Sequence, residues 1–147
     1  MDLGDAIKKR RFIRKYLTRK VENDKLDRVL EAGRLAPSAK NLQEWRFVVV
    51  RDEGRRKRLA EAAKGQTFVG EAPVVIAACA TVTDYVMTCG QLTYPIDLAI
   101  AVEHMVLTAR PRGWGPAGSG PSTSRRLRGS STLPSEVRCG DAPHLGT

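Results

Sequence analysis

The segment DLAIAVEHMVLTA, Asp97 to Ala109, is the feature that most limits what this chain can fold into. The apolar side chains of the helix that it predicts cover more than one face: Leu98, Ala99, Val102, Met105, Val106 and Ala109. A helix at the surface of a domain needs only one apolar stripe. We therefore expect this helix at the centre of the domain or in an interface between subunits.

Two helices are predicted near the N-terminus. Residues 2–10 can form a short helix, and the next segment, FIRKYLTRKV, reads as an extended or irregular link. A second helix is expected from Asn23 or Asp24, either of which can cap it, and Pro37 stops it. Its apolar face follows the spacing i, i+3, i+4 and i+7, with Leu26, Val29, Leu30 and Gly33.

Two strands and another helix are predicted between these segments and the apolar helix. RFVVVRD, residues 46–52, reads as a short apolar strand with charged ends. Asp52 caps a helix, RRKRLAEAA, which Gly65 closes. VVIAACA, residues 74–80, is apolar throughout, which is typical of a strand buried on both faces. This order of helices and strands predicts a layered α+β or α/β domain.

The length and the cysteines set the class of protein. A chain of 147 residues is long enough for one domain with a real core. No apolar run approaches the roughly 20 residues that a membrane span needs, and the charged N-terminus does not resemble a signal peptide. Three cysteines at positions 79, 89 and 139 fit neither a disulfide framework nor a CxxC pair. We expect a cytoplasmic protein with no membrane partner.

The composition changes at residue 110, which divides the chain into a domain of residues 1–109 and a tail of residues 110–147. Gly, Pro and Ser supply 18 of the last 38 residues, and the tail shows no apolar period. Composition alone favours a disordered tail. The tail is also rich in arginine, and the chain as a whole carries a formal net charge of +9. This charge indicates anionic partners without naming them.

The most basic stretch is KKRRFIRKY, Lys8 to Tyr16, with six cations in nine residues. Such a run can be a solvated surface, a nucleic-acid patch or half of a phosphate pocket. A non-catalytic protein that binds nucleic acid through residues 8–14 and the arginine-rich tail is one interpretation. Only Phe12 and Tyr16 lie nearby as stacking aromatics, and no known nucleic-acid motif is present, so nucleic acid is an unlikely partner.

Two motifs resemble the FMN-dependent nitroreductase family. RRFIRKY, from Arg10 to Tyr16, is similar to that family's R-R-S-x-R-x-[YF], and LAPSAKNLQEWRFVVV, from Leu35 to Val50, is similar to its A-P-S-x-x-N-x-Q-P-W. EAPVVIAACA and DLAIAVEHMVLTA look like its next strand and long central helix. The resemblance covers about residues 6–109. It implies an α+β fold, a three-layer sandwich with a central mixed sheet flanked by helices, here incomplete at the C-terminus.

The resemblance also implies a cofactor site for FMN. FMN carries a phosphate dianion and a ring with polar edges, and arginine side chains supply forked donors to such groups. Arg10 and Arg14 would lie on one side if the first helix persisted through them. In two positions the sequence departs from the family, because Phe12 replaces a Ser and Glu44 replaces a Pro. The residues expected to contact the flavin are Arg10, Arg11, Phe12, Arg14, Pro37, Ser38, Ala39, Asn41 and Gln66.

The family chemistry implied by the resemblance is electron transfer. NAD(P)H reduces FMN, and a nitroaromatic, quinone or similar acceptor then reoxidises it. No Ser–His–Asp set, paired carboxylates or metal-ligand spacing stands out, which fits a flavoenzyme in which the cofactor performs the chemistry. The resemblance also implies a homodimer with each flavin at the subunit interface, a role that suits the apolar helix.

The tail carries a separate hypothesis. The family continues after its central helix with a Gly-rich stretch similar to G-L-G-T-x-W-I-G-x-F, whereas this chain reads GWGPAGSGPST, Gly113 to Thr123. A coding sequence shifted by one base permits G-L-G-T-C-W-I-G-A-F-D at these positions. LPSEVR, Leu133 to Arg138, again resembles the family in the written frame. We hypothesise a frameshift or a sequencing error, and a chain with this tail is expected to bind FMN weakly or to be inactive.

Overall fold

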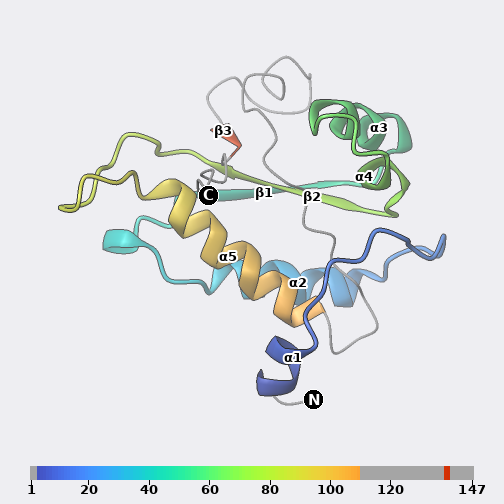
Figure 1. The fold of residues 1–147 in the computed structure, drawn as a ribbon, viewed down its shortest axis with the longest axis horizontal. Coiled ribbons are helices and arrows are strands. Elements are labelled where there is room, and N and C mark those ends of the chain that lie inside the picture. Colours follow the sequence, from blue (N-terminus) through green and yellow to red (C-terminus); the bar gives the residue numbers. More distant parts are fainter. Residues whose placement is uncertain (1–2, 110–137, 140–147) are drawn as a thin grey trace.

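The computed structural model describes residues 3–109 and 138–139 (Figure 1). The tail that carries the frameshift hypothesis, and with it the proposed division at residue 110, therefore lies almost entirely outside the described residues. In chain order the elements are α1 (Leu3–Lys8), α2 (Asn23–Arg34), the 3₁₀ helix η1 (Ala39–Asn41), β1 (Trp45–Val50), α3 (Glu53–Ala62), α4 (Thr67–Glu71), β2 (Val75–Ala80), α5 (Tyr94–Ala109) and β3 (Arg138–Cys139).

The sheet has the order β1–β2–β3, and both pairings are antiparallel. β1 and β2 pair along their whole lengths, with Trp45 opposite Ala80 and Val50 opposite Val75. β3 adds only two residues beside Cys79 and Ala80. The α+β class is confirmed, but the described strands show none of the parallel pairing that a mixed sheet would need.

Helices cover both faces of this sheet, which gives the predicted three layers (Figure 1). Because side chains alternate along a strand, one set of strand residues faces α3 and the other faces α2 and α5. Leu59 and Ala62 of α3 pack on the first set, which consists of Val48, Val50, Val75, Ala77 and Cys79. The second set consists of Trp45, Phe47, Ile76, Ala78 and Ala80.

α5 is the central helix of the domain, as its sequence predicts. Leu98 and Ala101 are buried against the sheet, and Met105 packs with Val29 of α2. α2 approaches α5 closely at Gly33, where an added Cβ would lie 2.8 Å from the Sδ atom of Met105. The apolar face predicted for the second helix is therefore the face that contacts α5.

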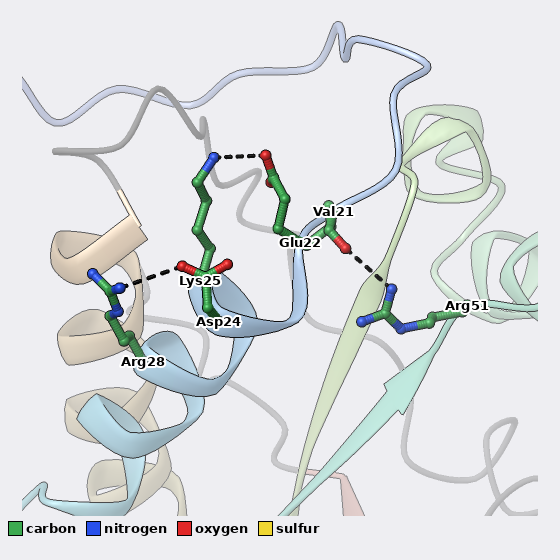
Figure 2. A network of polar contacts seen from close by, with 6 residues as sticks. All are labelled: Val21, Glu22, Asp24, Lys25, Arg28 and Arg51. Carbon is green, nitrogen blue, oxygen red and sulfur yellow. Dashed lines mark hydrogen bonds and ion pairs between the residues drawn. The ribbon is translucent and has the colours of Figure 1, made fainter.

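The start of α2 differs from the prediction. The N-cap residue is Glu22, and its side chain makes no capping hydrogen bond. Exposed charged side chains pair along this end of the helix: Lys25 donates to Glu22 at 2.8 Å and Arg28 to Asp24 at 3.3 Å (Figure 2). Arg51, which follows β1, donates to the carbonyl oxygen of Val21 at 3.2 Å and so links the sheet to the helix start.

The predicted cap of α3 is confirmed, since Oδ1 of Asp52 accepts a hydrogen bond from the backbone N–H of Arg55 at 2.9 Å. The helix ends at Ala62, and Gly65 follows with φ +74°, a left-handed conformation that glycine adopts at little cost. Two predictions are wrong in detail. α5 begins at Tyr94 rather than near Asp97, and most of β2 is half-buried, because only Cys79 and Ala80 are fully covered.

The link between α1 and α2 has no regular secondary structure, as expected. α1 ends at Lys8, so the helix does not persist through Arg10 and Arg14, and their spacing alone does not align them. α4 was not predicted, because TFVGE is too short to show a helical period. Across the described ranges, no helix has both the length and the apolar character needed to cross a membrane.

Candidate functional site

The turn Pro37–Asn41 lies between the end of α2 and the start of β1. Two residues of the turn and one just after it are left-handed without being glycine: Lys40 has φ 49°, Asn41 φ 54° and Gln43 φ 49°. This conformation is uncommon for residues with a Cβ. Backbone strain of this kind persists only where the surroundings impose it, and it is concentrated at functional sites. The second family motif therefore contains the most strained segment among the described residues.

Short polar side chains close the turn from within. Oγ of Ser38 accepts a hydrogen bond from the backbone N–H of Gln43 at 2.9 Å. Oδ1 of Asn41 accepts from the side-chain amide of Gln43 at 2.9 Å. The hydroxyl hydrogen of Ser38 and the NH₂ group of Asn41 can still donate to a ligand. Pro37 and Asn41 are exposed, and Ser38 and Ala39 are half-buried.

Asp97 ties this turn to the first turn of α5. The backbone N–H of Ala39 donates to both of its carboxylate oxygens, at 3.2 Å to Oδ1 and 3.1 Å to Oδ2. The side chain is 4% exposed, and its place near the helix N-terminus favours a negative charge.

Glu44, at the position where the family usually has Pro, is a second buried carboxyl group beside Asp97. It is 2% exposed, and its two side-chain oxygens have no hydrogen-bond partner among the described residues. Burial raises the pKa of Glu44, its own backbone N–H lowers it by less, and the neighbouring Asp97 raises it further. Both causes favour the protonated form of Glu44 relative to an exposed glutamate.

A short hairpin closes over the same turn from the loop between β2 and α5. Val86 and Leu92 form an isolated antiparallel bridge, and the ring of Tyr85 lies beside Lys40 with 4.6 Å between Nζ and the ring centroid. This is cation–π geometry. The hairpin thus contacts Lys40, which is the one charged residue of the turn Pro37–Asn41.

The basic segment meets α5 at a different place, and two of its arginines, Arg10 and Arg14, contact other residues of the chain. Nε of Arg10 lies 3.5 Å from Oε1 of Glu103, and its guanidinium lies 5.1 Å from the ring centroid of Phe12. The guanidinium of Arg14 lies 5.6 Å from the ring centroid of Phe68 in α4. All four predicted flavin residues of this segment, Arg10, Arg11, Phe12 and Arg14, are exposed, with Phe12 at 59%.

Gln66, the ninth predicted flavin residue, is the N-cap of α4 and is half-buried. Its backbone N–H donates to the carbonyl oxygen of Ala63, and its side chain makes no capping hydrogen bond. Because Phe68 contacts Arg14 from the same helix, Gln66 belongs to the neighbourhood of the basic segment rather than to that of the turn.

The two motifs meet different sides of α5. The turn contacts it through Asp97 and the basic segment through Glu103. A separation of six residues corresponds to about 9 Å along a helix axis and places the two positions about 120° apart around it. Within one chain, the structure therefore brings Pro37, Ser38, Ala39 and Asn41 together, but it does not join them to the arginines.

A cavity of about 420 Å³ also touches α5, and the end of the first motif lines it through Ile13, Lys15 and Tyr16. Its walls are mainly apolar and include Tyr16, Val29, Ile76, Met105 and Val106. None of the nine predicted flavin residues lines it. Burial and then the charge of Glu71 raise the pKa of Tyr16 at its edge.

Sequence reasoning missed Asp97, Glu44 and Tyr85. Asp97 offered a signal, because a carboxylate at the start of an otherwise apolar helix needs a partner. Glu44 was noticed only as a departure from the family, and nothing in the sequence indicated that it is buried. Tyr85 offered no signal, since its contact with Lys40 depends on how the hairpin folds back.

Comparison with known proteins agrees with this arrangement. The sequence model of the Nitroreductase family matches residues 7–81, which span both motifs and more than half of the chain. The chain belongs to the nitroreductase family. A "NADH dehydrogenase" of Thermus thermophilus is 44% identical over 95 residues, 65% of this chain and 46% of that protein. An "FMN reductase [NAD(P)H]" of Bacillus subtilis is 39% identical over 70 residues, 48% of this chain and 28% of that protein.

The fold of this nitroreductase-family chain is also similar to solved structures. A nitroreductase family protein from Clostridium novyi has a TM-score of 0.86 at 28% identity, covering 96% of this chain and 82% of that one. An FMN-dependent nitroreductase from Clostridium difficile has a TM-score of 0.80 at 30% identity, covering 92% and 81%. The chain nevertheless spans less than two thirds of the curated relatives named above.

Proposed function

We propose that this chain is an FMN-dependent oxidoreductase that passes electrons from NAD(P)H to a nitroaromatic, quinone or similar acceptor. The observation that carries the proposal is the strained turn Pro37–Asn41, which lies within the family motif and is held by the buried Asp97. The names of an FMN reductase and an FMN-dependent nitroreductase among its relatives support the same cofactor. Any impairment of activity by residues 110–147 remains a prediction.

The hydrogen-bond donors of these residues fit the acceptors of FMN. Arg10, Arg11 and Arg14 would hold the phosphate and the polar ring edge, as guanidinium groups do with planar anions. Ser38 and Asn41 keep donors for ring carbonyl oxygens, whereas the N–H of Ala39 is already taken by Asp97. Gln66 would offer its amide. When bound, FMN would supply the hydride and electron transfer.

We also propose that two copies of the chain form the complete site. The turn and Arg10 contact α5 at positions about 9 Å apart along its axis and about 120° apart around it, and no contact between described residues joins the turn to the arginines. A second copy packed against α5 would bring its own basic segment to the turn. The partly exposed Val102 and the apolar cavity beside Met105 supply the kind of surface that such packing covers. The cytoplasmic location stays a prediction.

The test is an FMN titration of the purified full chain, followed by flavin fluorescence. We expect Arg10→Ala with Arg14→Ala to weaken FMN binding at least about tenfold, because each hydrogen bond to a charged group contributes about 1.5–3 kcal/mol. Lys8→Ala with Lys15→Ala is the matched control, since it removes the same charge from exposed positions in the same segment. It should change the dissociation constant less than about twofold.

The same two double variants separate flavin binding from nucleic-acid binding. A nucleic-acid patch responds to total charge, so both variants should weaken it similarly and its affinity should fall steeply with salt. Equal effects of the two variants on FMN binding would remove the assigned arginine roles. A stoichiometric flavin band in the purified wild-type chain would show that the tail does not impair binding.

A further inference from the structure

Asp97 and Glu44 are a buried pair of carboxyl groups at the point where four segments meet. Asp97 comes from α5 and accepts the N–H of Ala39 in the turn Pro37–Asn41. Glu44 directly precedes β1. Its backbone carbonyl oxygen accepts hydrogen bonds from the backbone N–H and the hydroxyl of Thr81, both at 2.9 Å. Thr81 follows the last residue of β2. The pair therefore joins the turn to α5 and to both long strands.

The turn depends on this junction for its conformation. Lys40, Asn41 and Gln43 are left-handed, and the bonds made by Ser38 and Asn41 close the turn without attaching it to the rest of the domain. The attachment to α5 is made by Ala39 and Asp97, which lie 58 residues apart in the chain. A strained turn keeps its shape only when its surroundings fix it.

Glu44 and Asp97 differ in their hydrogen-bond partners. The carboxylate oxygens of Asp97 accept the N–H of Ala39, whereas the side-chain oxygens of Glu44 have no donor of this kind among the described residues. Burial and the neighbouring Asp97 raise the pKa of Glu44 above its ordinary value. When it is protonated, Glu44 carries an O–H donor beside Asp97.

We propose that Asp97, backed by Glu44, is a positioning residue that holds the turn Pro37–Asn41 in the conformation that receives the flavin. This inference rests on the proposed function. Asp97 does not touch the flavin in this scheme, and it acts only through the backbone of Ala39. The consequence is that FMN affinity depends on a buried acid that the family motif does not contain.

The first experiment is Asp97→Asn in the full chain, with two readouts. Asn offers one acceptor oxygen and no charge, so we expect the Ala39 amide to exchange with solvent at least about tenfold faster in the flavin-free chain. The dissociation constant for FMN should rise about tenfold. Asp52→Asn is the matched control, because Asp52 also accepts a backbone N–H, from Arg55 at 2.9 Å, far from the turn. It should leave both readouts unchanged.

A second variant removes the donor instead of the acceptor. Ser38 has φ −140° and ψ 156°, the extended conformation that a residue before proline prefers. Ala39→Pro therefore deletes the N–H that Asp97 accepts without altering α5. If Asp97 acts through that N–H, Ala39→Pro should also raise the FMN dissociation constant about tenfold. Combining it with Asp97→Asn should then add less than about twofold, as expected of coupled residues.

The outcomes separate this inference from the proposed function. Wild-type chain that binds no FMN would overturn the function, and Ala39 exchange in Asp97→Asn would still decide whether Asp97 holds the turn. An unchanged FMN dissociation constant in folded Asp97→Asn chain would overturn the positioning role. So would fully additive effects of Asp97→Asn and Ala39→Pro. Glu44→Gln, which keeps a neutral donor beside Asp97, should leave FMN affinity unchanged, and a tenfold loss would show that Glu44 acts in another way.

Discussion

Gly33 is the position where the packing of this domain can be tested most directly. It lies near the end of α2 and faces α5, which is the central helix of the domain. A Cβ added there would lie 2.8 Å from Sδ and 2.9 Å from Cγ of Met105, and 2.9 Å from Cζ of Phe47. All three distances are shorter than a real Cβ tolerates, so Gly33→Ala forces a neighbour to move.

Two opposing effects set the size of the change in stability. Replacing Gly by Ala inside a helix contributes about 1 kcal/mol through helix propensity. Extra volume in a packed core costs about 1–3 kcal/mol. The long side chain of Met105 can shift, but Phe47 is packed between the helices and the sheet and has less room. We therefore expect Gly33→Ala to lower the free energy of unfolding by about 1 kcal/mol.

The assay is urea unfolding followed by circular dichroism, with Gly54→Ala as the matched control. Gly54 lies in α3, and a Cβ there would meet only Oδ1 of Asp52, at an ordinary 3.5 Å. This variant should be more stable than wild type by up to about 1 kcal/mol, because it gains helix propensity without a clash. If Gly33→Ala is stabilised as much as Gly54→Ala, the close approach of α2 to α5 is wrong.

Two further predictions concern the turn and its acid pair. The pKa of Glu44 is raised above its ordinary value of 4.5 in the folded chain. Above pH 4.5 the folded chain therefore binds more protons than the unfolded chain. As a result, the contribution of Glu44 to stability is lost as the pH rises. Glu44→Gln removes this dependence, and thermal melts should show its advantage over wild type widening from pH 5 to pH 8; a constant gap would contradict the buried carboxyl. Lys40→Gly and Lys40→Ala both lose the contact with Tyr85, but Lys40 has φ 49°. The Gly variant should have the larger free energy of unfolding, by about 1 kcal/mol, and should therefore unfold at a higher urea concentration. Equal stabilities would contradict the left-handed backbone at this position.

The sequence predicts the helices of this domain best where their apolar residues repeat. Leu26, Val29 and Gly33 mark the face of α2 that contacts α5, and the spacing alone is enough to find it. The cap at Asp52 is equally local, since it depends on an N–H only three residues away. α4 has neither signal: five residues are too few to show a period, and its place is set by packing against α3.

The acid pair could not be predicted, because burial is not a property of a short segment. Glu44 precedes the strand residue Trp45 and looks like a surface charge in the sequence. It is buried only because α5 passes close to the start of β1 and brings Asp97 with it. The exposure of β2 also depends on neighbouring elements. Among the described residues, β3 pairs only with Cys79 and Ala80, and these two are the buried residues of β2.

α5 therefore has two roles that one physical feature explains. Its apolar surface makes it the core of the domain, and its few acids, Asp97 and Glu103, are the points where the two family motifs attach. Asp97 is buried in this helix, and the N–H of Ala39 offsets the cost of burying its carboxyl group. Glu103 is exposed, so its ion pair with Arg10 marks where the basic segment lies and adds little stability. The motifs are thus placed by the same helix that organises the core, at positions about 9 Å apart along its axis and on different sides of it.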